Sequence, residues 1–422
     1  MKKVRICLLP NKEQELKLWE HVNQARNVKN IFIFRCWELK NEGEFINKKT
    51  SNKLRLELTE MLKTDKYKYL NKTSRDTKDR EINDVVQSFV DYYNGTHGKP
   101  KYKKKRGSNK SFNVREARIS RKDNYFKIPS IGYIKATKKS LKNNVNIVDK
   151  IKERDKFRKA SIKYDGKHWY LFITYDDEKV NERKPRELTN EVIGIDLGIS
   201  PYVTCSNKKV IKNINSHSKI KKLEKRLSRL QRQASRKYEM NKEILKVYLI
   251  DEKGKPILDK RGNYKYYFNK TKNIIKVEKE ITKVNRKIKN IRQNFIHTIT
   301  KEIVEQYPQE IVIEDLKVEE MKNKFKHRAK SIGKANWYTF RKFLTYKCED
   351  RGILLTVANK WYPSSQTCSN CGNRLTKQDK LSLKDRTFNC TECNSSLDRD
   401  LNASINLMNY RYSKWYQDNI IS

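Results

Sequence analysis

Four cysteines between residues 368 and 393 have the spacing of a metal site. Cys368 and Cys371 form one C-x2-C pair, and Cys390 and Cys393 form a second pair after 18 intervening residues. Two such knuckles supply four thiolates in a tetrahedron, which is the coordination of a closed, structural Zn²⁺ site. Because disulfides are disfavoured in a reducing cytosol, we predict that these four thiols bind zinc.

Three acidic residues, far apart in the chain, are candidates for a second metal site. Asp196 follows the strand formers of EVIGIDLGIS (191–200), where a buried charge is unfavourable unless a metal or hydrogen bonds compensate it. Glu314 ends the strand-like run EIVIEDL (310–316), and Asp400 lies in the first turn of a predicted helix at 398–410. Three such carboxylates can hold two Mg²⁺ ions about 3.5–4 Å apart and promote phosphodiester hydrolysis. A turn-forming Asp196 is the alternative on this motif alone.

The neighbouring residues refine this assignment. Asp315 would point away from Glu314 on a strand, and we expect it to cap a helix that begins near Leu316. Asp398 suits the N-cap of the last helix. The small side chains of Ala403 and Ser404 would let that helix approach a sheet closely.

Composition indicates a polyanionic partner. The 422 residues include 97 Lys and Arg against 50 Asp and Glu, for a formal charge of +47. A nucleic acid would neutralise this self-repulsion, and a membrane surface is the weaker alternative. No apolar run approaches the roughly 18 residues of a spanning helix, and the opening MKKVRICLLPNKEQ lacks a signal-peptide core. A cytoplasmic, nucleoid-associated protein is expected.

The first half of the chain predicts a β-domain with a helical insertion. Lys2–Leu9 is a strand candidate, residues 11–62 and 77–93 have helical periodicity, and residues 111–176 have strand patterns. The clearest hairpin is 160–174, with its turn at Asp165-Gly166.

A basic loop lies between the helices and the strands. Residues 95–107 place six cationic side chains around one ring, a pattern suited to phosphate contacts and stacking, although a solvated loop is the alternative. The residues are Lys99, Lys101, Tyr102, Lys103, Lys104, Lys105 and Arg106.

The second half predicts a sheet with a helical hairpin. Strands at 202–205 and 210–214 would form a meander with the Asp196 strand. Two long basic helices follow, and their apolar residues, spaced alternately by three and four, predict an antiparallel pair with a coiled-coil seam. Residues 237–270 look like an inserted hairpin or loop. Strands at 310–316 and 352–358, separated by a helix at 337–350, suggest parallel pairing.

Four motifs, in order, resemble the RuvC-type nuclease of the TnpB family, which comprises transposon-encoded RNA-guided DNA endonucleases related to miniature type V CRISPR effectors. The motifs are GIDLG (194–198), VIEDL (312–316), YPSSQTCSNCG (362–372) and DRDLNAS (398–404). The resemblance extends to LLPNKEQELKL (8–18), GKPKYKKKRGSNKSF (98–112) and NIRQNFIHTIT (290–300). Asn394 departs from the family, which usually has Gly after the last Cys, and 237–270 is longer than typical.

The resemblance implies a multidomain α/β and β protein. Its parts would be a wedge-like β-barrel domain (1–10 and 96–182), a helical recognition domain (11–95), a linker (183–186), an RNase H-like (RuvC) nuclease (187–360 and 398–422, with a basic helical hairpin at 215–300) and an inserted zinc ribbon (361–397). It implies Asp196, Glu314 and Asp400 as the Mg²⁺-binding catalytic triad, with Ser364, Ser365 and Arg386 nearby. It also implies a guide RNA and target DNA as partners; we expect a monomer.

Two other classes compete with this reading. One is an RNA-guided binder that no longer cuts and acts as a repressor. The other is a zinc-ribbon DNA-binding protein or transposase that needs no RNA. Within the same fold, a miniature CRISPR effector is a further alternative to a transposon protein.

Overall fold

The computed structural model describes residues 2–105, 110–115, 119–142, 157–175, 187–250, 254–258, 262–376, 381 and 385–421. The chain divides into two compact units, residues 1–179 and 180–422. In the described ranges, no helix is both long and apolar enough to cross a membrane. The predicted linker at 183–186 and Arg106 of the basic loop lie outside the described residues.

The first unit contains an antiparallel sheet of seven strands in the order β2-β6-β7-β1-β5-β4-β3. The predicted hairpin is confirmed: β6 and β7 pair antiparallel, and Asp165 accepts hydrogen bonds from the backbone N–H groups of Lys167 and His168 in the turn. The strands are β1 (Lys2–Leu9), β2 (Lys110–Val114), β3 (Ser120–Lys122), β4 (Tyr125–Ile128), β5 (Gly132–Ala136), β6 (Phe157–Tyr164) and β7 (Trp169–Tyr175).

Helices of this unit pack both on the sheet and on one another. Within the described residues they are α1 (Lys12–Asn41), α2 (Thr50–Met61), α3 (Arg75–Tyr93) and α4 (Lys138–Lys142), with a 3-10 helix at Asp65–Lys72. Helix α1 begins where Asn11 and Gln14 form a capping box. Its first half buries Leu18 and Val22 in the core of the sheet, and its second half buries Phe32 in a separate core with α2 and α3.

The second unit is built on a five-stranded sheet in the order β10-β9-β8-β13-β14. Strand β8 pairs parallel with β13, which pairs parallel with β14, whereas β9 and β10 run antiparallel. Both the predicted meander and the predicted parallel pairing are therefore confirmed. The strands are β8 (Thr189–Leu197), β9 (Val203–Cys205), β10 (Val210–Ile211), β13 (Pro308–Glu314) and β14 (Leu354–Ala358).

Helices cover both faces of this sheet. On one face, Ile195 and Ile313 share a core with residues of α8 and α11, such as Ile299 and Phe340. On the other face, Val312 packs with Leu407 of α12, among other residues. The helices are α8 (Lys272–Val304), α9 (Val318–Lys324), α10 (Ala329–Ala335), α11 (Trp337–Glu349), α12 (Arg399–Met408) and α13 (Lys414–Tyr416).

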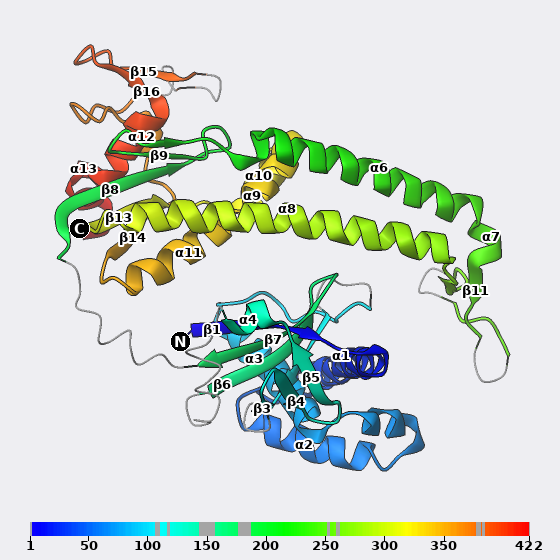
Figure 1. Ribbon diagram of the computed structural model, residues 1–422. Helices are drawn as coiled ribbons and strands as arrows, with labels where there is room; N and C mark the ends of the chain where they lie inside the picture. The colour runs from blue at the N-terminus through cyan, green and yellow to red at the C-terminus, as the bar shows by residue number, and fades with distance from the viewer. Residues whose placement is uncertain are drawn as a thin grey trace. The chain divides into compact units, whose positions relative to one another are not determined.

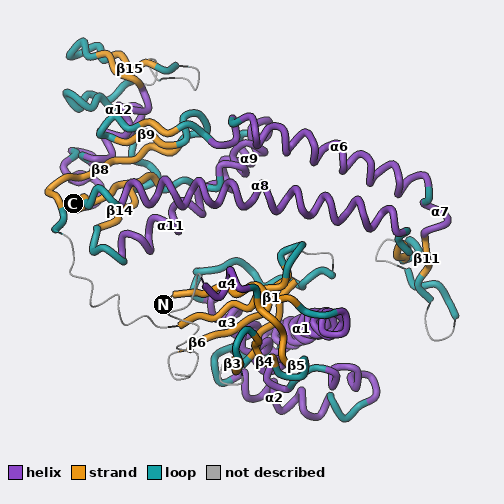
Figure 2. The backbone as a smooth tube through the Cα atoms, in the orientation of Figure 1, coloured by secondary structure: helices purple, strands orange, loops and turns teal. Residues whose placement is uncertain are grey.

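The predicted pair of long helices is α6 (Ser218–Met240) and α8. They follow β10 and precede β13 in the chain, and they run side by side (Figures 1 and 2). Ile220 of α6 and Val284 and Ile288 of α8 are buried in a small core, with Leu223 and Leu227 packed against it. These are seam positions expected from the heptad spacing.

Two small hairpins complete the unit. The inserted segment contains α7 (Lys242–Leu245) and a hairpin of β11 (Lys246–Tyr248) and β12 (Tyr266–Phe268), at the far end of the helical pair (Figure 1). The cysteine segment contains β15 (Thr387–Asn389) and β16 (Ser396–Asp398), which pair antiparallel just before α12.

Candidate functional site

The alternation of side chains along two parallel strands brings two acidic residues to the same face of the sheet. In β8, Val192, Gly194 and Asp196 alternate with Ile193 and Ile195, which point into the opposite core. In β13, Glu314 follows Val312 at the same spacing, and Val312 packs on the α12 side. Because β8 and β13 are adjacent and parallel, their carboxyl ends place Asp196 and Glu314 at one edge.

Helix α12 packs on this face and contributes the third acidic residue. Asp398 caps the helix by accepting hydrogen bonds from the backbone N–H groups of Asp400 and Leu401 at 3.0 and 2.9 Å, as predicted. This cap fixes the first turn, in which the side chain of Asp400 is 17% exposed. Ala403 and Ser404 are buried, so the predicted close packing of their side of the helix is confirmed.

Gly194 makes that close packing possible, and sequence reasoning missed it. A Cβ atom at Gly194 would lie 1.9 Å from the backbone oxygen of Ser404 and 2.4 Å from the backbone nitrogen of Met408. Both atoms belong to the helix backbone, which cannot rotate away as a flexible side chain can. The contact between α12 and the sheet therefore requires glycine at position 194, the first residue of GIDLG. Asp196, which lies on the same face of the strand, follows two residues later.

The three acidic residues interact electrostatically. Burial, followed by the charges of Glu314 and Asp400, raises the pKa of Asp196 well above its usual range. Burial also raises the pKa of Glu314, against a hydrogen bond from Ser364 that lowers it. Burial and the nearby Asp398 raise the pKa of Asp400. Because each shift disfavours the ionised form, the cluster is a site that a cation would stabilise.

Two of the further residues implied by the resemblance contact the triad. The Ser364 hydroxyl donates a hydrogen bond to Glu314 Oε1 at 2.8 Å. The Arg386 guanidinium lies 3.5 Å from Asp400 Oδ2. Ser365 occupies the same 3-10 turn as Ser364, and no hydrogen bond within the described residues joins its hydroxyl to the three carboxylates.

Two buried asparagines on α12 hold the Ser364 segment in place, and sequence reasoning missed both. Asn406 donates to the backbone oxygens of Ser364 and Thr367 at 2.8 and 2.7 Å. Asn402, one turn earlier, donates to the Thr367 oxygen at 2.8 Å and accepts from the Ser369 N–H at 2.9 Å. Their i, i+4 spacing on the buried side of the helix was the available signal.

A basic residue inside DRDLNAS was also missed. The positive charge of Arg399, between Asp398 and Asp400, lowers the pKa of Asp196, Glu314 and Asp400, opposing the larger effect of burial in each case. Arg399 thus partly balances the negative charge of the site.

The expectation for Asp315 was wrong. Helix α9 begins only at Val318, after Lys317, and no side chain caps it. Asp315 instead forms ion pairs with Arg341 at 2.9 Å and with Lys317 at 2.8 Å. Local sequence favoured a cap, but tertiary structure brings Arg341 of α11 close enough to bind this carboxylate.

The four predicted metal-binding cysteines come together. Ligand atoms of Cys368, Cys371, Cys390 and Cys393 all lie within 4.8 Å of one another. Among the described residues, they are the only group of three or more His, Cys, Asp or Glu side chains close enough to share one ion. Asp196, Glu314 and Asp400 do not form such a group within the described residues.

Electrostatics also fit a cation between the thiols. Hydrogen bonds from Ser395 and Asn370 lower the pKa of Cys393 to about 5. A backbone hydrogen bond from Asn373 lowers the pKa of Cys371, but burial and the neighbouring thiols outweigh it and raise that pKa to about 12. The opposite directions arise because adjacent thiols cannot all ionise without a compensating positive charge.

The departure at Asn394 preserves the geometry of the knuckle. Gly372, which follows the second cysteine of the first pair, has φ +75°, and Asn394, in the equivalent place after Cys393, has φ +55°. Both are in the left-handed region, where Asn is better tolerated than most residues other than Gly. The substitution therefore leaves the turn intact.

The basic loop of the first unit rests on α1. Asn30 exchanges two hydrogen bonds with the backbone of Lys103, at 2.7 and 3.1 Å. The ammonium of Lys99 lies 4.6 Å from the centre of the Trp37 ring. Tyr102 is 53% exposed, and Lys101, Lys104 and Lys105 are exposed. The loop presents charge and a ring to solvent, and its contact with nucleic acid stays a prediction.

Two family descriptions match parts of the chain. Residues 337–407, from α11 to α12, match the family described as "Cas12f1-like, TNB domain". Residues 260–324 match the family described as "Probable transposase". The first match spans the cysteine segment and Asp400, and the second includes Glu314.

Individual proteins match most of the chain. A putative RNA-guided DNA endonuclease of Streptomyces pristinaespiralis is 25% identical over 352 residues, which cover 83% of this chain and 75% of that protein. The putative RNA-guided DNA endonuclease InsQ of Escherichia coli K12 is 23% identical, over 95% of this chain and 90% of that protein.

The fold is also found in a solved structure. The protein in a cryo-EM structure of the Cas12f1-sgRNA-target DNA complex superposes with a TM-score of 0.56 at 15% identity, over 94% of this chain and 82% of that chain. At this identity the similarity shows a shared fold.

Proposed function

The chain belongs to the TnpB family, and we propose that it is an RNA-guided DNA endonuclease that cuts with an RNase H-like (RuvC) site. The observation that carries this proposal is the arrangement of Asp196, Glu314 and Asp400 on the α12 face of one sheet. The two relatives that match most of the chain are named as putative RNA-guided DNA endonucleases, which supports the same activity.

Asp196, Glu314 and Asp400 would hold two Mg²⁺ ions. Their donor set suits this cation, because Mg²⁺ prefers carboxylate oxygens, and their raised pKa values indicate uncompensated negative charge. Bound Mg²⁺ would activate water and stabilise the leaving oxygen of a phosphodiester. Within the protein, Ser364 orients one oxygen of Glu314, and Asn406 holds the segment that carries Ser364.

The four cysteines would hold a structural Zn²⁺. All four positions of a tetrahedron are filled by thiols, which leaves no open position for chemistry. The ribbon lies directly before α12, so its fold sets where that helix, with Asp400, begins.

We assign the remaining parts on the same basis. Residues 1–10 and 96–182 would form the wedge-like β-domain, 11–95 the helical recognition domain, 187–360 and 398–422 the nuclease, and 361–397 the zinc ribbon. Base pairing with a guide RNA would supply sequence specificity, and the protein would recognise a short motif beside the target. A monomer is expected.

Substitution of the three acidic residues tests the proposal. Full-length protein is purified with its RNA, the RNA is sequenced, and cleavage of matching DNA is measured with Mg²⁺. Asp196→Ala, Glu314→Ala and Asp400→Ala should each abolish cleavage and keep RNA-dependent DNA binding. Asp315→Asn, next to Glu314 but paired with Arg341 and Lys317, is the matched control and should cleave normally.

The same assay separates the alternatives. Normal cleavage by any of the three alanine variants would remove that residue from the mechanism. Guided binding without cleavage by the unmodified protein would favour a repressor. DNA binding that persists after RNase treatment, in protein that carries no RNA, would favour a transposase or zinc-ribbon protein that needs no guide.

A further inference from the structure

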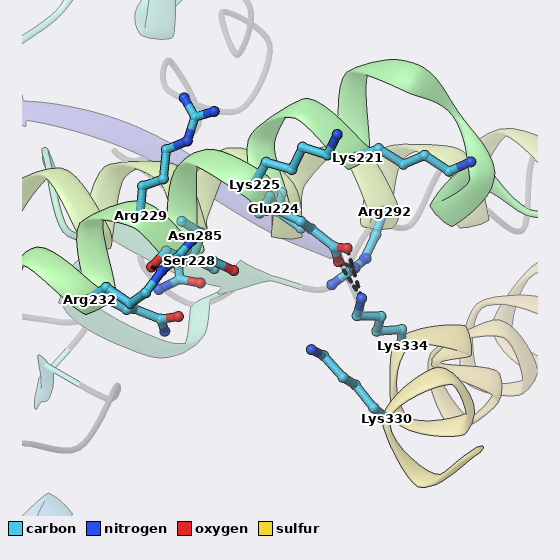
Figure 3. Close-up of a pocket in the computed structure, with 13 residues that line it drawn as sticks. Lys221, Glu224, Lys225, Ser228, Arg229, Arg232, Asn285, Arg292, Lys330 and Lys334 are labelled. Atoms are coloured by element: carbon cyan, nitrogen blue, oxygen red, sulfur yellow. Dashed lines mark hydrogen bonds and ion pairs between the residues drawn. The ribbon is translucent and has the colours of Figure 1, made fainter. Parts of the chain in front are cut away.

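A basic groove of about 820 Å³ lies between α6, α8 and α10 of the second unit (Figure 3). Helix α6 contributes a row of cationic side chains, Lys221, Lys225 and Arg229, spaced four residues apart. Residues four apart lie on one face of a helix, one above the other. The three side chains therefore share one face of α6, and all three line the groove.

The other two helices add positive charge from other sides. Arg292 comes from α8, and Lys330 and Lys334 come from α10 and extend toward the α6 side (Figure 3). Arg232 lies at the far end of the α6 row. The residues that line the groove thus carry seven cationic side chains against one carboxylate, that of Glu224.

Among the described residues, Glu224 forms ion pairs with two of the groove cations, Arg292 and Lys334, and with none of the other five. Its carboxylate is 2.8 Å from Arg292 and 2.7 Å from Lys334. Arg292 also donates to Asn215 Oδ1 at 2.7 Å, so its guanidinium is held from two sides. Burial alone would raise the pKa of Glu224, but the hydrogen bonds and charges of Lys334 and Arg292 keep it below its ordinary value. Glu224 is therefore ionised at neutral pH.

The lining of the groove suits a sugar–phosphate backbone better than a compact ligand. It combines apolar side chains of the helical seam, Leu227 and Ile288, with the polar Ser228, Gln231 and Asn285. Lys225, Arg229 and Lys330 are exposed and free of the geometric constraint that Glu224 imposes on Arg292 and Lys334. An open row of cations matches a repeating polyanion, whereas a small anion would need an enclosed cage.

We propose that this groove binds the phosphodiester backbone of the guided complex, meaning the guide RNA or the DNA paired with it. Arg292 and Lys334 are fixed contacts, and Lys225, Arg229 and Lys330 are adjustable ones. The backbone comes from the guide RNA or from the DNA paired with it, and the experiment separates the two sources. The inference rests on the proposed function and assigns it a surface outside the acidic site.

The test compares two triple variants of the full-length protein. Lys225→Ala, Arg229→Ala and Lys330→Ala remove three groove cations. Lys276→Ala, Lys279→Ala and Lys289→Ala remove the same charge from exposed positions of α8 that do not line the groove. The probes are the copurified RNA, transcribed in vitro, and DNA complementary to its guide segment. Kd is measured for RNA alone and for DNA with RNA bound, from 0.1 to about 0.5 M salt.

Loss of three phosphate contacts has a calculable size. A plot of the logarithm of the binding constant against the logarithm of salt concentration has a slope to which each phosphate contact contributes about 0.7–0.9. Loss of three contacts should therefore lower the magnitude of this slope by about 2–3. The same slopes give a loss of roughly 50- to 170-fold in affinity at 0.15 M salt. The control variant loses only long-range attraction, so we expect a change of a few-fold.

Each outcome decides between sources or overturns the inference. Weaker binding of RNA alone assigns the groove to the guide. Normal RNA binding with weaker DNA binding assigns it to the guided DNA. A groove variant that binds both probes as the control variant does shows that the inference is wrong. Protein that carries no RNA and binds DNA after RNase treatment would instead refute the proposed function.

Discussion

A single methyl group at Gly194 should separate α12, which carries Asp400, from the sheet. The Cβ of Gly194→Ala would lie 1.9 Å from the Ser404 backbone oxygen, and real Cβ contacts are essentially never shorter than 3.0 Å. The helix must therefore recede by about 1.1 Å or the strand must bend by the same amount. Either movement changes the distance between Asp196 and Asp400, which lie on opposite sides of this contact.

The expected effect on cleavage is large compared with the effect on folding. Overpacking of this kind costs about 1–3 kcal/mol, which a unit of this size can survive. A displacement of about 1 Å at a catalytic group lowers the rate by about 100-fold. We therefore expect cleavage of guided DNA to fall by about 100-fold, while binding of the copurified RNA and zinc content stay at the level of the unmodified protein.

Gly333→Ala is the matched control. A Cβ there would meet only the side-chain Cε of Lys322 at 3.7 Å, an ordinary contact. Because Gly333 lies within α10, alanine should stabilise this helix by about 0.5–1 kcal/mol and leave cleavage unchanged. Cleavage by Gly194→Ala within about twofold of the unmodified protein would show that the contact between α12 and β8 does not control the site.

Three further predictions concern the acidic and cysteine sites. Ser364→Ala should lower cleavage at neutral pH by about tenfold and shift the acidic limb of the pH–rate profile to higher pH. The reason is that the variant loses the hydrogen bond that lowers the pKa of Glu314. An acidic limb at unchanged pH would contradict this role of Ser364. Without divalent cations, the melting temperature should rise as pH falls from 8, because an acid whose pKa is raised by folding stabilises the folded state when it is protonated. Addition of Mg²⁺ at pH 8 should raise the melting temperature similarly. Asp196→Asn should weaken both the pH effect and the Mg²⁺ effect. Equal responses of this variant and the unmodified protein would show that Asp196 is not the group responsible. Cys390→Ser should reduce zinc to well below one equivalent and lower the yield of folded protein, and unchanged metal content would exclude the four-thiol site.

The sequence determined the local elements and the ligand types. Spacing alone identified the four cysteines, and the two-residue period of strands located Asp196 and Glu314 at strand ends. The apolar spacing within each long helix, such as Ile220 and Leu223 in α6 and Val284 and Ile288 in α8, predicted the helical pair. These signals are local, because each depends on residues within one element or on a fixed spacing between neighbours.

Only the tertiary structure decided which distant groups meet. Strand alternation could not show that α12 lies on the face of Asp196 and Glu314, nor that Gly194 must lack a side chain to admit it. Asp315 pairs with Arg341 of another helix, 26 residues away, and so does not cap α9. The groove between α6, α8 and α10 likewise depends on three helices whose mutual packing is fixed by long-range burial and leaves no period in the sequence.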